Sequence, residues 1–270
     1  PKIDLLQPVP VVAELPFQPG DIRLEPRLNL AKELGADVTI NINELKTAEE
    51  RIARVQEVTG GRGADVVVEC LPAGRFTEVA FPAVRAGRIF LPLSVGALLD
   101  SPGLIDLARE TGARIIVPTG ALLGLDAVRA AAEGDIYSVR MVTRKPPAAL
   151  AGAPYLEEHG ISLEDLTRPL KVFAGSARDG ARGFPANVNV AAALSLAGIG
   201  PDLTQLEIWA DPDVTRNSHD IEVEADSARF RMTIENVPTE ENPGTGRITA
   251  LSAGVPLSLR KSARKASKLA

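Results

Sequence analysis

The run ADVVVEC at residues 64–70 decides the fold class. Its centre is continuously apolar, which is typical of a parallel strand covered on both faces. Amphipathic patterns at residues 47–58 and 75–86 stand on either side of it and predict helices, each followed by glycine. Further short strands and one more helix are expected at residues 38–40, 89–93, 114–117 and 104–111. Strand and helix in alternation predict a parallel sheet with right-handed crossovers.

The pattern changes after about residue 132. Three segments that alternate apolar and polar residues lie at residues 205–210, 221–225 and 230–235. Such alternation is typical of antiparallel strands with one face in water. Before them we expect two strands, a Pro- and Gly-rich loop and a small-residue helix, at residues 136–143, 170–173, 145–166 and 187–197.

These two patterns predict an α/β protein with two domains. A Rossmann-type parallel sheet would occupy residues 1–120, with an atypical N-terminal part. A catalytic and dimerisation domain of α+β type, with a mostly antiparallel sheet, would occupy residues 121–245. A C-terminal helix or basic tail would complete the chain at residues 246–270.

Composition narrows the class of protein. Of the 270 residues, 45% are hydrophobic and 24% charged, which is typical of globular proteins. The single cysteine excludes an internal disulfide. The first residues show no secretory signal pattern, and no apolar run approaches the roughly 20 residues of a membrane span. A net charge of -5 argues against a nucleic-acid partner. We expect a cytoplasmic protein with a small-molecule substrate, no membrane contact and no metal site.

Several motifs between residues 63 and 251 follow one another in a set order. They are VVECLP at 67–72, LSVGAL at 93–98, VPTGA at 117–121, TRKPP at 143–147, GFPANVNVA at 183–191, WADP at 209–212 and RNSH at 216–219. In these motifs the chain resembles the L-aspartate dehydrogenase family. The resemblance implies oxidative deamination of L-aspartate to iminoaspartate or oxaloacetate and ammonia, with NAD or NADP, in NAD biosynthesis. It also implies a homodimer formed through the second domain.

The first part of the chain departs from that family. A dinucleotide-binding domain normally opens with a strand and a G-x-G-x-x-G turn, which lets the backbone approach the pyrophosphate. Residues 1–30 contain one glycine, Gly20, and no such turn, so we predict weak cofactor binding. Residues 27–70 are instead similar to part of the cofactor domain of medium-chain alcohol dehydrogenases, through LGAD at 34–37 and TGGRGAD at 59–65.

His219 is the candidate acid/base residue. It lies between a turn signal and a strand that we expect to start near Ile221, and an imidazole titrates near neutral pH. After hydride leaves the carbon–nitrogen centre, water attacks the imine, and a base must take a proton from that water. A lone histidine with polar neighbours is usually a surface residue, but the resemblance at RNSH makes His219 catalytic. His159 has the pattern of an exposed loop residue without a role.

Candidate cofactor contacts follow the ends of predicted strands, where ligands bind in open α/β sheets. By resemblance, Ala121 and Asn189 contact the cofactor. The strand-end positions add Cys70, Leu71, Pro72, Ser94 and Gly96. The alternatives are an ordinary strand-to-helix turn at residues 118–121 and a capping role for the Asn residues that open the helix at 187–197. We expect Cys70 to pack against the sheet rather than act as a nucleophile.

A substrate with two carboxylates calls for cationic or polar donors. Arg144, Lys145 and Asn187 are the candidate substrate ligands, and Arg216 lies near the motifs as well. The alternative for each cation is an exposed surface charge. Two other functions stay open at this stage: a dehydrogenase of the medium-chain alcohol type, and a non-catalytic nucleotide-binding protein.

Overall fold

The computed structural model describes residues 12–15, 29, 38–41, 44–45, 47–239, 246–249 and 251–253. The chain divides into two compact units, Pro1–Val67 and Val68–Ala270. The predicted domain change near residue 120 falls inside the second unit and stays a prediction. The prediction that residues 1–30 lack a phosphate-binding turn concerns a segment that lies almost wholly outside the described residues.

The first unit contains a parallel strand pair and a helix. Strand β1 (Val12–Leu15) pairs in parallel with β2 (Val38–Asn41). Helix α2 (Ala48–Val58) begins after Thr47, whose hydroxyl accepts a hydrogen bond from the Glu50 N–H while the Glu50 carboxylate accepts one from the Thr47 N–H. This reciprocal capping satisfies two N–H groups that a helix start leaves unpaired. The strand and helix predicted here are confirmed.

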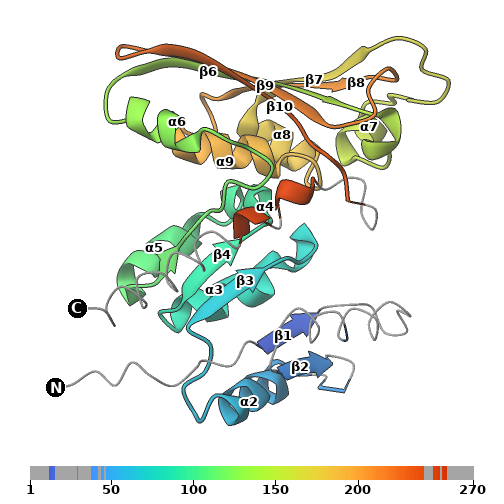
Figure 1. Ribbon diagram of the computed structural model, residues 1–270. Coiled ribbons are helices and arrows are strands. Elements are labelled where there is room, and N and C mark those ends of the chain that lie inside the picture. The colour runs from blue at the N-terminus through green and yellow to red at the C-terminus, as the bar shows by residue number, and fades with distance from the viewer. Residues whose placement is uncertain are drawn as a thin grey trace. The chain divides into compact units, whose positions relative to one another are not determined.

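A three-stranded sheet forms the first part of the second unit (Figure 1). Its strands lie in the order β3 (Val66–Glu69), β4 (Ile89–Pro92) and β5 (Arg114–Ile115), and β4 is parallel to β5. Alternating with them along the chain are η1 (Ala73–Arg75), α3 (Phe76–Arg85), α4 (Val95–Leu99) and α5 (Pro102–Thr111). The short α4 was not predicted. Its first residue, Val95, lines the pocket described below.

A five-stranded sheet forms the rest of the second unit. Its order is β10-β9-β6-β8-β7, for β6 (Ile136–Lys145), β7 (Leu170–Ser176), β8 (Gln205–Ala210), β9 (Ser218–Ala225) and β10 (Arg229–Glu235). The last three strands were expected to lie together as antiparallel neighbours, and this is wrong in one respect. Strand β6 lies between β8 and β9, antiparallel to β9 and parallel to β8. The sheet is mixed and mostly antiparallel, so the predicted fold class is confirmed.

Helices cover one face of this sheet. In Figure 1, α6 (Leu125–Ala131), α8 (Ala177–Gly183) and α9 (Asn189–Ala197) lie beneath the strands. Their buried side chains share one core with those of β6 to β9. Four of the six buried residues of α9 are alanines, so the helix packs closely against its neighbours.

The loop predicted at residues 145–166 contains regular structure. It includes η2 (Pro147–Ala149) and α7 (Pro154–Glu158), so the prediction of a plain loop is wrong there. Tyr155 of α7 packs edge-on against Phe173 of β7, which ties the segment to the sheet. Among the helices of the described part of the chain, none is long and apolar enough to cross a lipid bilayer.

Candidate active site

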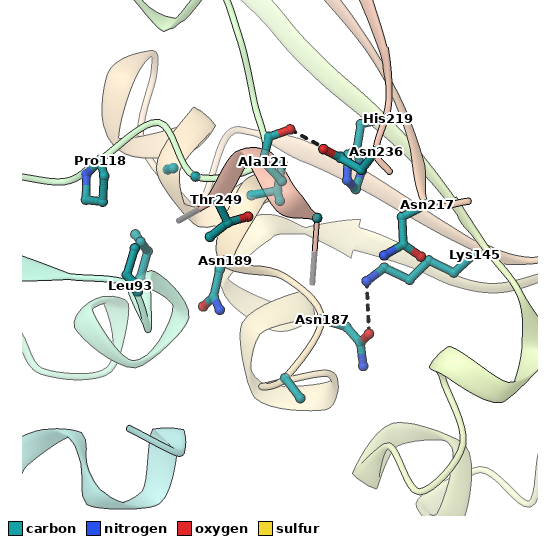
Figure 2. A pocket seen from close by; sticks show the side chains of 16 residues that line it. Leu93, Pro118, Ala121, Lys145, Asn187, Asn189, Asn217, His219, Asn236 and Thr249 are labelled. Atoms are coloured by element: carbon teal, nitrogen blue, oxygen red, sulfur yellow. Dashed lines mark hydrogen bonds between the residues drawn. The ribbon is translucent and has the colours of Figure 1, made fainter. Parts of the chain in front are cut away.

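A pocket lies within the second unit (Figure 2). The end of the five-stranded sheet, the start of α9, the segments that follow β4 and β5, and residues 246–249 all contribute to its wall. Its polar lining consists of Lys145, Asn187, Asn189, Asn217, His219, Asn236 and Thr249. Its apolar side is formed chiefly by Leu93, Val95, Pro118, Ala121 and Val190. One wall is therefore polar and the other suits a flat, apolar ring.

Strand register explains why the polar side chains meet. Thr143 of β6 lies opposite His219 of β9, and His219 lies opposite Ile234 of β10. Residues two apart on a strand face the same side. Lys145 on β6 therefore shares a face with Thr143, and Asn236, whose N–H donates to the Asn217 carbonyl at 2.9 Å, continues that face beyond β10.

His219 is almost fully enclosed, with 2% of its surface exposed. Its Nδ1 lies 3.1 Å from the Thr143 hydroxyl oxygen. Burial, together with the positive charge of Lys145, lowers the pKa of His219 to about 3. The imidazole is therefore neutral at physiological pH, the form that accepts a proton. The sequence placed His219 just before a strand, whereas it lies inside β9.

Lys145 is a buried cation. It is 4% exposed, and its ammonium donates a hydrogen bond to Asn187 Oδ1 at 3.0 Å. No carboxylate of the described residues forms an ion pair with it. Burial lowers the pKa of Lys145 to about 8. An unpaired buried charge is costly, and a lysine that stays charged here gains from a bound carboxylate.

The start of α9 carries the two predicted asparagines. The residue that caps the helix is Val188, with no side-chain capping bond, so the capping alternative is wrong. Asn189 Oδ1 instead accepts the N–H of Gly96 in α4, at 3.0 Å. This bond joins α4 to α9, and it fixes Gly96 and Asn189 together at the pocket wall.

Only some of the predicted strand-end residues lie at the pocket. Ala121 lines the pocket, while Ser94 and Gly96 lie within the segment whose Leu93 and Val95 line it. Cys70, Leu71 and Pro72 are not among the lining residues. Cys70 is exposed, so the expectation that it packs against the sheet is wrong.

The buried carboxylate beside these strand ends is Glu69. It accepts hydrogen bonds from the N–H groups of Leu71, at 2.6 Å, and Ser94, at 3.1 Å. Burial raises its pKa, and these bonds oppose the shift. Glu69 thereby ties together the segments that follow β3 and β4.

Arg144 does not join the site. Its guanidinium pairs with Asp211 at 3.2 Å and lies 4.8 Å from the centre of the Trp209 ring. It is not a lining residue of the pocket, and neither is Arg216, which is exposed. We therefore do not retain Arg144 as a substrate ligand. His159 is exposed and stacks on Tyr155, as expected of a residue without a role.

Sequence reasoning missed Asn217, Asn236 and Thr249. Asn236 donates a hydrogen bond from Nδ2 to the Ala121 carbonyl at 3.2 Å. Thr249 belongs to a helical segment whose Ser252 hydroxyl accepts the N–H of Gly120 at 3.0 Å. Asn236 follows a strand and precedes Val237-Pro238, which has the pattern of an ordinary turn. Asn217, inside the RNSH motif, carried the only available signal.

Comparisons with known proteins assign the family. A family model described as "Aspartate dehydrogenase, C-terminal" matches residues 126–258. An L-aspartate dehydrogenase from Bradyrhizobium diazoefficiens is 61% identical over 192 residues, which are 71% of this chain and 68% of the relative. The chain belongs to the aspartate dehydrogenase family. The resemblance inferred from the motifs is thereby confirmed.

Other members of the aspartate dehydrogenase family agree. L-aspartate dehydrogenase 3 of Bordetella bronchiseptica is 61% identical over 71% of this chain and 70% of its own length. An L-aspartate dehydrogenase of Methanosarcina acetivorans is 42% identical, over 77% of this chain and 78% of its own. The crystal structure of aspartate dehydrogenase from Thermotoga maritima superposes with a TM-score of 0.58 and 23% identity, over 74% of this chain and 76% of its own. That similarity supports the shared fold.

The second resemblance is also found. A family model described as "Zinc-binding dehydrogenase" matches residues 23–97, which include the segment at 27–70 where the sequence predicted this similarity. Within the described part of the chain, no three His, Cys, Asp or Glu side chains are grouped as metal ligands would be.

The pocket fits the nicotinamide end of NAD(P), the cofactor of this family. Asn189, held by the Gly96 N–H, provides a polar edge beside an apolar wall of Leu93, Val95 and Pro118. Because Asn189 Oδ1 already accepts from Gly96, its amino group is left to donate to an acceptor such as a carboxamide or a ribose oxygen. A flat apolar ring with a polar substituent suits this combination.

Proposed function

We propose that this chain oxidises L-aspartate to iminoaspartate with NAD(P), in the pocket that holds His219 and Lys145, and that water then releases oxaloacetate and ammonia. Membership of the aspartate dehydrogenase family supports the reaction. The observation that carries the assignment is a single pocket that holds a neutral histidine and a buried ammonium without an ion-pair partner among the described residues. A dianionic substrate supplies what that ammonium lacks.

Lys145 anchors a carboxylate of the substrate. Its ammonium has one acceptor, Asn187 Oδ1, and two further N–H bonds to give. A carboxylate entering the pocket would form an ion pair in a site shielded from water, where such a pair is strongest. Asn187 holds the ammonium in place and offers its own amino group to the same ligand.

His219 takes the proton from the attacking water. If its Nδ1–H donates to Thr143, the other nitrogen, Nε2, carries the free lone pair. NAD(P), when bound, would accept the hydride from the substrate carbon after the α-ammonium group has released one proton to water, which leaves the protonated imine. Water then adds to the imine carbon as Nε2 removes one of its protons, and the proton later leaves with the amine nitrogen as ammonia forms.

The two alternative functions fit the pocket less well. A medium-chain alcohol substrate has no carboxylate, which would leave the Lys145 ammonium unpaired in the complex. A protein that only binds nucleotides has no use for a buried neutral histidine next to a buried ammonium, because both cost stability. Both observations favour catalysis on an amino acid that carries a side-chain carboxylate.

A homodimer, a cytoplasmic location and a part in NAD biosynthesis stay predictions. The apolar face of the second sheet gives no reason for a homodimer, since α6, α8 and α9 of the same chain cover it. We keep the homodimer on the resemblance alone, and light scattering at micromolar concentration tests it.

The direct test is reduction of NAD or NADP by the purified chain with L-aspartate. D-aspartate, L-alanine and ethanol serve as comparison substrates, since each lacks the stereochemistry, the second carboxylate or the amine. We expect turnover with L-aspartate that exceeds each of the others by at least about 100-fold, the scale of one buried ion pair. Equal or greater turnover with ethanol would replace this function by the alcohol type.

A further inference from the structure

Asn236 has an acceptor atom that nothing in the described part of the chain satisfies. The residue is 4% exposed, and its Nδ2 donates to the Ala121 carbonyl. That bond fixes the amide orientation, because a carbonyl accepts only from the amino side. Oδ1 must then point away from Ala121. It is the one buried side-chain polar atom without a hydrogen-bond partner among the described residues.

The residue that carries the unsatisfied atom lines the pocket. Asn236, His219 and Lys145 all line it, and Figure 2 shows the Asn236 amide on the side of the pocket that holds His219. Gly246, another lining residue, packs against this atom so closely that a Cβ at position 246 would come within 2.8 Å of Asn236 Oδ1. A side chain at position 246 would therefore press on the unsatisfied acceptor.

We propose that Asn236 Oδ1 accepts a hydrogen bond from the α-amino group of the substrate. This inference rests on the proposed function. Lys145 binds a carboxylate and His219 is the base for the attacking water, so neither of them binds the amine. A buried acceptor without a donor costs free energy, and an N–H group of the ligand satisfies it. Asn236 is then the residue that selects an amine over a plain dicarboxylate.

The carboxamide of the nicotinamide also has N–H donors and is the second source of this chemistry. The two sources separate by which ligand depends on Asn236. If Asn236 contacts the substrate, its substitution weakens the binding of L-aspartate and leaves the binding of NAD(P) unchanged. If it contacts the carboxamide, its substitution weakens the binding of NAD(P).

The experiment compares Asn236→Leu with Asn236→Asp. Leucine has a similar shape and removes both polar atoms, whereas aspartate keeps an acceptor and loses the donor to Ala121. Succinate, which is aspartate without its amine, is the matched ligand. Three quantities are measured in wild type and variants: KM for L-aspartate, the competitive inhibition constant of succinate, and the dissociation constant of NAD(P).

In Asn236→Leu we expect the ratio of the L-aspartate KM to the succinate constant to rise roughly 10- to 100-fold, the range for a hydrogen bond to a charged group. In Asn236→Asp the ratio does not rise, because an acceptor for the amine is kept, and NAD(P) binding changes by less than about 3-fold in both variants. The ratio cancels any general damage to the carboxylate site.

Three results would overturn the inference. An unchanged ratio in Asn236→Leu shows that the amine does not use this atom. An equal rise in both variants assigns the effect to the bond with Ala121. A weakened NAD(P) complex assigns the acceptor to the carboxamide. These three results bear on the inference when the wild-type enzyme turns over L-aspartate. A wild type without that activity would refute the proposed function itself.

Discussion

Arg144 and Lys145 are neighbours in the sequence, yet they lie on opposite faces of β6. Arg144 pairs with Asp211 and stacks on Trp209, so its charge is satisfied by the protein. Lys145 is buried, and its only partner among the described residues is the Asn187 amide. The sequence offered both as substrate ligands. The comparison teaches that the burial and the partners of a cation, rather than its position in a motif, separate a structural charge from a binding one.

The same difference extends over the two faces of the sheet. The face opposite the helices carries cross-strand pairs, such as Arg140 with Glu207 and Arg231 with Glu222. Partly exposed pairs of this kind contribute about 0–1 kcal/mol each. The covered face holds the pocket, where polar groups are buried and incompletely paired. We therefore expect substitutions on the pocket face to change activity far more than those on the other face.

The largest effect is expected for His219→Ala. Loss of the base should lower kcat by about 10²–10⁴-fold, while the dissociation constant of NAD(P) stays nearly unchanged. Steady-state kinetics and a cofactor titration measure the two quantities. His159→Ala is the matched control, because this exposed histidine stacks on Tyr155 and should retain wild-type turnover. Wild-type turnover in His219→Ala would exclude the assignment.

Lys145→Met should raise KM for L-aspartate by roughly 30- to 1000-fold, the range for one partner of a buried charge pair. Arg144→Met, on the neighbouring residue, should change it by less than about 3-fold. Parallel kinetic measurements on the two variants test the comparison between the faces. Equal losses would mean that the opposite face also takes part in binding.

Lys145→Met should weaken substrate binding and yet raise the free energy of unfolding. Burial lowers the pKa of Lys145 from 10.5 to about 8, so the unfolded chain binds this proton more tightly than the folded one. The resulting loss of stability grows as pH falls from 10.5 to 8 and is fully present at pH 7. Lys145→Met removes it and should stabilise the fold by about 1–3 kcal/mol, less the lost bond to Asn187. Arg144→Met should cost up to about 1 kcal/mol. Urea unfolding at pH 7 compares them, and a destabilised Lys145→Met would contradict the account.

Much of this architecture was accessible from the sequence. The apolar run at residues 64–70 predicted a strand, which is β3, and the alternation near residues 205–235 predicted the second sheet. The expectation that the first of these strands is covered on both faces is wrong among the described residues, because Val68 is 40% exposed. The pairing order was not accessible, because inserting β6 between β8 and β9 depends on contacts between segments more than 60 residues apart. Local patterns carry no information on such pairings.

The site was predicted only in part, because local patterns also carry no information on which distant residues meet in a pocket. His219, Ala121, Asn189, Lys145 and Asn187 line one pocket. Asn236 was missed because its role depends on Ala121, whose carbonyl fixes the amide from 115 positions away. Arg144 lies outside the pocket, because a motif gives the type of residue, while strand register decides which face it occupies.

The measurement that most directly tests Lys145 as the carboxylate anchor is the inhibition constant of succinate between pH 6.5 and 9.5. Succinate stays a dianion over this range, so the titrating group must belong to the protein. Since the pKa of Lys145 is about 8, the constant should be flat below about pH 7.5 and rise above pH 8, approaching tenfold per pH unit. Lys145→Met should bind succinate weakly and show no such rise. A constant that stays flat to pH 9.5 in the wild type, or one that still rises in Lys145→Met, would contradict the assignment.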